Sequence, residues 1–372
     1  MPTEFEKLKS LHEDLIRSLF TTKDRERALE TINNKLSNQA DVVEIMRVLA
    51  TDEDEDMPPL YHGETKRMDQ LDVLRGKRVL LLISRIDIPS EDIESIKRVT
   101  IDTGEDEIVW MPVINYSIAG LEYRVKNELE TLKILRNSMS WYSVQPSMVT
   151  DDAIHFFEHK WGFKGTPILI LLSPSGEVLR YDILDMVRIW QNLSVDNLTY
   201  DMEAQLWEKE TWNLKLLVND IVDPIIQKWI REERYIIVYG GNDVDWIRRF
   251  TRQAHSIASN LRARIEIVYV GNRHNKDLGR RVQNVILTEQ LSHCLPESSM
   301  AYFWTRFDSM ITSKRRFSDK DGCLLQEMLR FHHHKEWVLL ARGSTILVNG
   351  TGQIALNALE DMEKWRTKLL QS

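Results

Sequence analysis

The chain has 372 residues, of which 42% are hydrophobic and 28% are charged, with a formal net charge of -8 at pH 7. This length exceeds what one hydrophobic core usually supports, so we expect more than one domain. An acidic balance argues against general binding to the backbone of nucleic acids, and no segment approaches the ~18 consecutive apolar residues of a membrane-spanning helix. The composition is that of an ordinary soluble globular protein.

The N-terminus and the cysteines both indicate the cytosol. Residues 1–6, Met-Pro-Thr-Glu-Phe-Glu, are acidic where a signal peptide has a basic and then an apolar region. Cys294 and Cys323 are the only cysteines, which is far too few for a disulfide framework and fits a reducing compartment. We therefore expect a cytoplasmic protein.

Residues 1–70 are predicted to form a helical region that ends in an acidic linker. Apolar residues recur every three or four positions from Phe5 to Leu19, and a second amphipathic stretch covers residues 24–49. The acidic run of residues 52–56 is followed by two prolines, which make a charged and stiff segment. The first domain boundary is placed there.

Residues 71–195 alternate short apolar runs with helical stretches, which is typical of an α/β domain with a largely parallel sheet. The pattern predicts strands over residues 78–83 and 107–114, joined by a helix over residues 90–101. The further predicted elements are helices over 121–135 and 151–160, a hairpin over 167–181 with its turn at 173–176, and a closing helix through Met186 and Trp190.

This order of elements is similar to that of the thioredoxin fold. Residues 138–144, Ser-Met-Ser-Trp-Tyr-Ser-Val, resemble the Met-Pro-Trp segment of nucleoredoxin-type proteins. Gly165-Thr166-Pro167 stands where thioredoxins carry a cis proline before their third core strand. The resemblance therefore predicts a cis bond between Thr166 and Pro167, which is rare for proline bonds in general.

The same order recurs after a predicted helical connector over residues 196–232. We infer that residues 233–372 form a C-terminal α/β domain, a second and diverged thioredoxin-like unit in tandem with the first. Its predicted elements are a strand over 235–239, a helix over 244–261, a strand over 264–270, helices over 279–291, 298–312 and 324–331, strands over 337–341 and 346–348, and a helix over 353–370.

Neither unit has the cysteines of a redox catalyst. Thioredoxin-type catalysis needs two cysteines, separated by two residues, at the turn after the first core strand. That turn is Arg-Ile-Asp-Ile-Pro-Ser at residues 85–90, and its counterpart is Gly-Gly-Asn-Asp-Val-Asp at residues 240–245. Disulfide exchange is excluded at both turns, so we expect scaffolds rather than enzymes.

No other motif predicts a catalytic, cofactor-binding or metal-binding residue. Gly240-Gly241 lacks the lysine and the spaced third glycine of phosphate-binding loops, which favours a tight turn or a helix cap. The histidine run of residues 332–334 has no second group of ligands at a standard spacing, which favours an exposed loop over a zinc site. We therefore predict no cofactor and no metal ligand.

The acidic run of residues 52–56 resembles a calcium-binding loop only in part. Asp52, Asp54 and Asp56 alternate as in an EF-hand loop, but Met57 stands where the sharp turn needs glycine. A glutamate is also missing, since Gly63 stands where a bidentate glutamate is needed. This excludes a tight EF-hand and leaves open a weak contact between calcium and a flexible acidic segment.

Several stretches are similar to the sieve element occlusion family, the phloem filament P-proteins that include the forisome subunits. The resemblance covers the C-terminal two-thirds of that family and runs from about Asp41 to the C-terminus. The stretches are Val-Leu-Arg-Gly-Lys at 73–77, Glu-Ile-Val-Trp-Met-Pro-Val at 107–113, Glu-Lys-Glu-Thr-Trp at 208–212, Tyr-Gly-Gly-Asn-Asp at 239–243, Glu-Ile-Val-Tyr-Val-Gly at 266–271 and Phe-Trp-Thr-Arg at 303–306.

The resemblance implies a non-enzymatic structural protein in the cytoplasm of phloem sieve elements. Its subunits would assemble into filaments that plug sieve plates after wounding, with other copies and other family members as partners and with neither nucleic acid nor membrane insertion. Family members usually carry a longer N-terminal region, so residues 1–70 are expected to be a remnant of it. The alternatives are a regulatory protein-binding module, calcium-responsive or not, that partners longer members without forming filaments, and a redox enzyme of thioredoxin ancestry.

Overall fold

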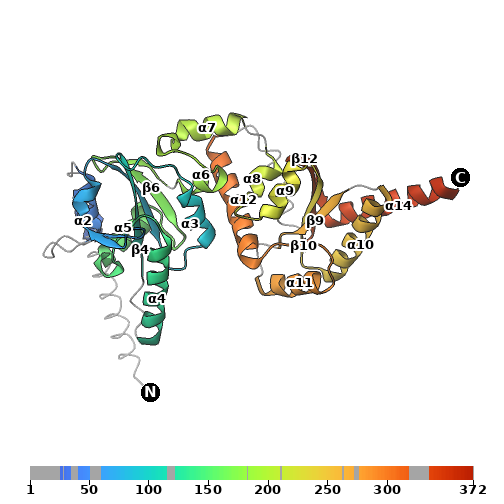
Figure 1. Ribbon diagram of the computed structural model, residues 1–372, viewed down its shortest axis with the longest axis horizontal. Helices are drawn as coiled ribbons and strands as arrows, with labels where there is room; N and C mark the ends of the chain where they lie inside the picture. The colour runs from blue at the N-terminus through green and yellow to red at the C-terminus, as the bar shows by residue number, and fades with distance from the viewer. Residues whose placement is uncertain are drawn as a thin grey trace, which may run out of the picture. The chain divides into compact units, whose positions relative to one another are not determined.

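Figure 1 shows the chain as a computed structural model. The structure describes residues 26–27, 29–34, 41–50, 60–114, 122–181, 183–209, 212–261, 264–271, 276–317 and 335–371. Several predictions fall outside these ranges: the helix from Phe5 to Leu19, the acidic run of residues 52–56, the helix over 324–331 and the histidine run of residues 332–334.

The chain divides into two compact units. Unit 1 comprises Met1–Ile88, Lys97–Leu184 and Asn192–Leu198. Unit 2 comprises Pro89–Ile96, Asp185–Gln191 and Thr199–Ser372. Two short segments that interrupt the sequence of unit 1 therefore belong to unit 2. Among the described helices, none is long and apolar enough to cross a membrane.

Unit 1 is built around a seven-stranded mixed sheet with the order β2-β1-β5-β4-β3-β6-β7. Strands β3, β4 and β5 run parallel, β6 and β7 continue the sheet in antiparallel sense, and the β1–β2 hairpin pairs antiparallel with β5. The strands are β1 (Leu60–His62), β2 (Arg67–Asp69), β3 (Arg78–Ser84), β4 (Asp106–Pro112), β5 (Tyr142–Ser143), β6 (Ile168–Leu172) and β7 (Val178–Arg180).

Both faces of this sheet are buried, which explains the continuous apolar runs of its central strands. Leu81 on β3 lies in the core that includes α2 (Val42–Ala50) and α5 (Asp151–Lys160). Leu80 and Leu82 point to the opposite face, because side chains alternate along a strand, and they are equally inaccessible. The other helices in this part of the sequence are η1 (Leu71–Leu74), α3 (Ser90–Lys97), α4 (Glu122–Ser138), η2 (Pro146–Met148), α6 (Leu184–Ile189) and η3 (Val195–Asn197).

The strands and helices predicted between residues 78 and 190 are confirmed, with shifts at their ends. The largest shift is in the helix predicted over residues 90–101, which ends at Lys97. It is followed by the β-branched run of residues 99–101, which disfavours a helix, and the N–H of Thr100 donates to the carbonyl oxygen of Leu193 at 2.8 Å. The hairpin of β1 and β2 and the short strand β5 were not predicted.

The predicted cis bond between Thr166 and Pro167 is wrong, since no cis peptide bond occurs in the described part of the chain. The trans form is the ordinary state of a bond before proline, favoured by about 0.5–1 kcal/mol. The turn before β6 is made instead by Gly165, whose φ of 86° suits a residue without a side chain.

Unit 2 contains a five-stranded mixed sheet with the order β10-β9-β8-β11-β12. Strands β8, β9 and β10 are parallel, while β11 is antiparallel to β8 and β12 is antiparallel to β11. The strands are β8 (Tyr235–Gly240), β9 (Ile265–Tyr269), β10 (His293–Cys294), β11 (Trp337–Arg342) and β12 (Thr345–Thr351). The helices are α7 (Tyr200–Lys209), α8 (Leu214–Leu217), α9 (Pro224–Arg231), α10 (Val244–Leu261), α11 (Lys276–Thr288), α12 (Glu297–Phe317) and α14 (Gly352–Gln371) (Figure 1).

The two sheets share one pattern of order and direction. In unit 1 the strands β5-β4-β3-β6-β7 consist of three parallel strands followed by two antiparallel ones. The strands β10-β9-β8-β11-β12 of unit 2 follow the same pattern. The chain is therefore a mixed α/β protein with two mixed sheets of related design.

Unit 2 buries an ion pair that links its two short segments. The carboxylate of Asp92 on α3 is fully inaccessible and accepts two hydrogen bonds from Arg188 on α6, from Nε and from Nη2, both at 2.7 Å. Burial disfavours the charge of Arg188, but the Asp92 carboxylate outweighs it and raises the pKa of the guanidinium above its ordinary value. Two paired hydrogen bonds between ionised groups are among the strongest in proteins.

A second buried arginine lies on α12. Arg306 is fully inaccessible, and its guanidinium donates to the carbonyl oxygens of Arg188, Leu216 and Leu217. Two of these carbonyls belong to the end of α8, where helix carbonyls have no partner within the helix. The Tyr302 hydroxyl on the same helix hydrogen bonds to the Ser95 hydroxyl on α3. The α12 helix therefore holds both short segments through polar groups.

Candidate functional site

The first turn that could carry redox chemistry is occupied by an arginine. Arg85 follows β3 and lies against the loop before Pro167, because a Cβ placed on Gly165 would be 3.0 Å from the Arg85 guanidinium carbon. In a thioredoxin-type enzyme this place would hold a reactive thiolate. A guanidinium cannot attack a disulfide, so the arrangement has no redox chemistry of its own.

The corresponding turn of unit 2 is acidic. The Oδ1 atom of Asp243 accepts hydrogen bonds from the N–H groups of Asp245 at 2.9 Å and Trp246 at 3.0 Å, which caps the start of α10. Glu336, in the loop before β11, packs against Gly241, whose φ is 148°. Burial raises the pKa of Glu336, and the Asp243 carboxylate raises it further. The cap of α10 is therefore made by Asp243, while Gly240 is the last residue of β8.

The described cysteine is chemically quiet. Cys294 is a free thiol at the end of β10, and its Sγ lies 3.7 Å from the carbonyl oxygen of Leu295. Burial raises the pKa of this thiol to about 12, so it stays protonated at neutral pH. Because the thiolate is the reactive form, Cys294 is not suited to nucleophilic or redox catalysis.

Unit 2 also contains an apolar pocket between its sheet and the α12 helix. Four aromatic side chains contribute to its lining, and none of the lining residues is titratable. Trp304 uses its indole N–H for a hydrogen bond of 3.1 Å to the carbonyl oxygen of Val270. The pocket therefore has no group for acid–base or nucleophilic chemistry. The lining residues are Leu214, Leu217, Val238, Phe303, Trp304, Phe307, Trp337, Val338, Leu339 and Asn349.

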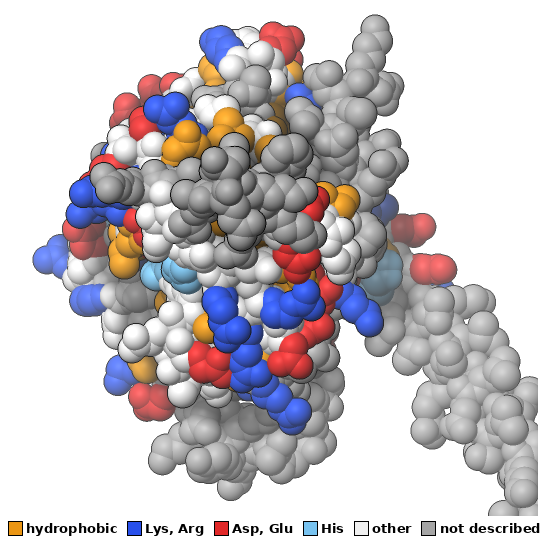
Figure 2. Space-filling view, turned by 90° about the vertical axis from the view of Figure 1, so that its right-hand side faces the viewer, with side chains coloured by type: hydrophobic (Ala, Val, Ile, Leu, Met, Phe, Trp, Pro, Cys, Tyr) orange, Lys and Arg blue, Asp and Glu red, His pale blue; other side chains and the backbone are white. Residues whose placement is uncertain are grey.

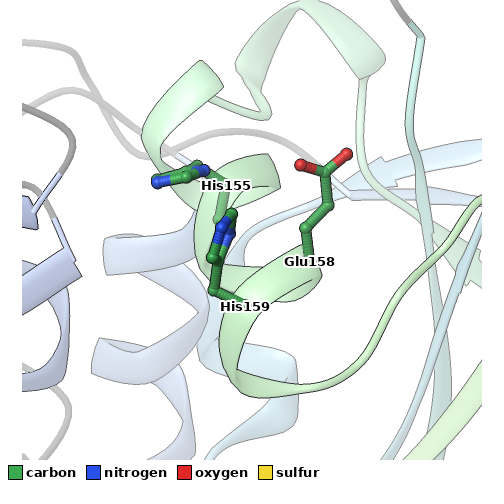
Figure 3. A group of neighbouring side chains, drawn as sticks. All are labelled: His155, Glu158 and His159. Atoms are coloured by element: carbon green, nitrogen blue, oxygen red, sulfur yellow. The ribbon is translucent and has the colours of Figure 1, made fainter. Parts of the chain in front are cut away.

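One cluster of metal-ligating side chains is formed in the described part of the chain, on α5 (Figure 3). His155, Glu158 and His159 each offer one ligand atom, and these atoms all lie within 4.8 Å of one another. The imidazole rings of His155 and His159 have centroids 3.9 Å apart. The cluster stands on the accessible side of α5, since Glu158 and His159 are exposed and His155 is half-buried.

The local sequence explains where α5 begins and which of its side chains are buried. Thr150 caps the helix by accepting a hydrogen bond of 3.1 Å from the N–H of Ala153. Ala153, Phe156 and Phe157 form its buried face, whereas His155 is half-buried and Glu158 and His159 are exposed. The helix is thereby anchored by its apolar side and leaves the histidines accessible.

Sequence reasoning missed this cluster, although a signal for it exists. His155-Phe-Phe-Glu158-His159 has the H-x-x-E-H spacing of one class of zinc peptidases. In zinc peptidases the glutamate of such a motif is the general base and only its two histidines bind the metal, so a third protein ligand has to come from elsewhere in the chain. Among the described residues, no further histidine, cysteine or acidic side chain joins the group. The cluster therefore lacks the full donor set of a peptidase.

Comparison with known proteins gives one consistent family. The family model "Sieve element occlusion C-terminus" matches residues 201–372. Three Arabidopsis thaliana proteins are similar. "Protein SIEVE ELEMENT OCCLUSION B" is 32% identical over 97% of this chain and 52% of its own length, and "Protein SIEVE ELEMENT OCCLUSION A" is 31% identical over 83% and 39%. "Protein SIEVE ELEMENT OCCLUSION C" is 26% identical over 64% and 34%, so the chain spans about half or less of the curated relatives it matches.

Among solved structures, a cysteine-to-alanine mutant of tryparedoxin-I is similar with a TM-score of 0.27 and 16% sequence identity. The match covers 38% of this chain and 87% of that protein.

Proposed function

Because the chain belongs to the sieve element occlusion family, we propose that it is a non-enzymatic structural subunit that assembles into filaments in phloem sieve elements. Its role is to occlude the sieve element and seal wounds. Its partners are further copies of the chain and other subunits of the family, in the cytoplasm. The absence of cysteine at residues 85–90 and 240–245 supports a role without redox catalysis.

The scaffold of the proposed subunit is a tandem of two thioredoxin-like units. The shared pattern of three parallel and two antiparallel strands in the two sheets supports this. We further propose the division expected from the sequence, with residues 1–70 as a helical region, 71–195 as the first unit, 196–232 as a connector and 233–372 as the second unit.

The observation that carries the assembly proposal is the outer edge of β12. In the described part of the structure this strand pairs only with β11, so its other edge is unpaired. Its sequence, Thr-Ile-Leu-Val-Asn-Gly-Thr, contains neither a charge nor a proline over seven residues. Leu347 and Val348 are 47% and 62% exposed. An uncharged edge of this kind is a template for pairing with another strand.

The other described edge strands do not present a long uncharged edge. Strands β2 and β7 have three residues each and carry Arg67, Asp69 or Arg180, and β10 has two residues. On the described part of the face in Figure 2, hydrophobic side chains form small groups among Lys, Arg, Asp and Glu. Among the described edge strands, β12 is therefore the one that we propose for pairing between subunits.

A lysine at the β12 edge tests the proposal. We expect the parent chain to form large species that increase with concentration in sedimentation velocity. Val348→Lys should shift this transition at least about tenfold upward in concentration, because edge lysines block pairing between strands. Leu287→Lys is the matched control, since Leu287 on α11 is 55% exposed but lies on no sheet edge.

A chain that stays monomeric at every concentration, alone and with longer family members, would overturn the assembly function. If Val348→Lys and Leu287→Lys had equal effects on a chain that assembles, assembly would not use the edge of β12. Repeating the series in millimolar calcium tests whether the acidic run of residues 52–56 adds a calcium response.

A further inference from the structure

We propose that α5 carries a surface site for a divalent transition-metal ion of the zinc class, held by His155, Glu158 and His159. The inference is independent of filament assembly. It rests on the placement of three ligand atoms, on the hydrogen bond that sets one imidazole, and on the chemistry of the donor set.

The three side chains lie on one face of the helix. Residues separated by three and four positions are neighbours on a helix surface, so His155, Glu158 and His159 project together. Their ligand atoms are within 4.8 Å of one another. Zinc binds imidazole nitrogen and carboxylate oxygen at about 2.0–2.2 Å, which places tetrahedral ligand atoms about 3.4 Å apart. The remaining gap would be closed by small rotations of the exposed Glu158 and His159 side chains.

A hydrogen bond to the backbone orients the imidazole of His159. Its Nδ1 atom lies 2.9 Å from the backbone carbonyl oxygen of His155. A carbonyl oxygen only accepts, so in the neutral imidazole this contact selects the tautomer with the proton on Nδ1 and the lone pair on Nε2. Metal-bound histidines commonly donate their other N–H to a carbonyl in this way, which fixes the tautomer and the ring. The backbone of α5 therefore prepares Nε2 as a ligand.

The donor set selects the kind of ion. Two imidazole nitrogens and one carboxylate suit zinc, copper or nickel, whereas calcium takes six to eight oxygen ligands. His159 lies in the last turn of α5, where the negative end of the helix dipole favours a cation. Three protein ligands leave a fourth tetrahedral position for water. The site is therefore an open zinc-type site, distinct from any calcium contact of the acidic run.

The test is metal titration of the full chain. All proteins would carry alanine at residues 332–334, because that histidine run could bind metal independently. Zinc binding is measured by calorimetry, and cobalt binding by its visible absorption, which reports ligand type and geometry. We expect one ion per chain, with nitrogen-rich tetrahedral or five-coordinate cobalt spectra.

Three variants decide the assignment. His159→Gln should weaken zinc binding at least tenfold, as losses around metal sites usually do, and Glu158→Gln should weaken it less. His255→Gln is the control, because His255 is also an exposed histidine on a helix, α10. Circular dichroism should show all variants folded, since these side chains lie outside the buried core. Absence of binding in the parent, or equal affinity in His159→Gln, would overturn the site.

Discussion

The sheets of the two units share a strand pattern, but the two units bury different kinds of side chain. The sheet of unit 1 is covered on both faces by aliphatic and aromatic side chains, and fewer buried polar groups occur among its described residues than among those of unit 2. Unit 2 buries several charged groups on helices that pack together. Its buried polar and charged residues are Asp92, Ser95, Asp185, Glu203, Asn219, Asp223, Thr251, Ser299, Arg306, Ser309 and Ser313, whereas those of unit 1 are Ser84, Asp106, Ser143, Ser173 and Arg180.

The two units therefore show two different contributions of a sequence to a fold: the apolar pattern of the strands and the pairing of buried charges. Apolar strands that run in the right order are enough to set the topology of a sheet, because patterning largely decides the fold class. Buried ion pairs add little net stability relative to apolar packing, but breaking one is costly. We expect the stability of unit 2 to fall more on the loss of a single buried charge, and the stability of unit 1 to fall more on the loss of a single buried aliphatic side chain.

The largest effect is expected from Asp92→Asn. Loss of this charge leaves the buried Arg188 guanidinium with two weaker partners, the Asp185 carboxylate at 3.8 Å and the Ser309 hydroxyl at 3.4 Å. Stranding a buried charge typically costs about 3–5 kcal/mol of unfolding free energy. Urea denaturation followed by circular dichroism measures this cost. Asp87→Asn is the control, because Asp87 is exposed and should change stability by less than about 0.5 kcal/mol.

The double variant Asp92→Leu with Arg188→Met sharpens this result. Replacing a whole buried ion pair by apolar residues is often close to neutral. We expect the double variant to be at least about 2 kcal/mol more stable than Asp92→Asn alone. A double variant as unstable as the single one would show that the ion pair is not the cause.

The next effect is expected in unit 1 from Leu81→Ala. Leu81 is fully buried in the centre of β3, and the truncation should cost about 3 kcal/mol through lost burial and a cavity. Leu179→Ala in β7 of the same sheet is the control, since Leu179 is 49% exposed. If calorimetry resolves two transitions, Leu81→Ala should lower one and Asp92→Asn the other. If calorimetry shows a single transition and both variants lower it, the two units unfold together as one cooperative body.

The smallest effect is expected from Asp223→Asn. Asp223 caps α9 by accepting hydrogen bonds from the N–H groups of Ile225 at 2.7 Å and Ile226 at 3.0 Å. Its carboxylate also forms a hydrogen bond of 2.8 Å with Nε2 of His293. Asparagine is also a good cap, so the loss at pH 7 should be only about 0.5–1 kcal/mol.

The pH dependence of that variant gives a second readout. Burial alone would raise the pKa of Asp223, but the hydrogen bonds from His293 and from the backbone of α9 outweigh it and lower the pKa. A carboxyl with a depressed folded pKa stabilises the protein above its unfolded pKa of about 3.9 and loses that contribution as the pH falls further. The parent should therefore lose more stability below about pH 4 than Asp223→Asn does. Parallel acid unfolding curves would contradict this assignment.

The sequence predicted what depends on local pattern. The runs at 78–83, 167–172 and 235–239 became strands because each is long, apolar and bounded by turns or polar residues. The β1–β2 hairpin, β5 and β10 were missed because strands of two or three residues have no readable period. Their pairing is decided by neighbouring strands that are distant in sequence.

The buried charges were also beyond local pattern. Asp92 stands in the polar run Ser90-Glu91-Asp92 at the start of a helix, where solvent exposure is the ordinary expectation. Its partner Arg188 lies 96 residues further along the chain. The zinc-type cluster is different, since its three residues fall within five consecutive positions of one helix, and only the H-x-x-E-H spacing had to be recognised.

The placement of α3 in unit 2 has a consequence for synthesis. Ser95 and its partner Tyr302 are 207 positions apart. A ribosome adding about 5–20 residues per second takes on the order of 10–40 s to make the intervening chain. During that interval the Ser95 hydroxyl lacks its Tyr302 partner, so the nascent chain completes the packing of α3 against α12 only after α12 has left the exit tunnel.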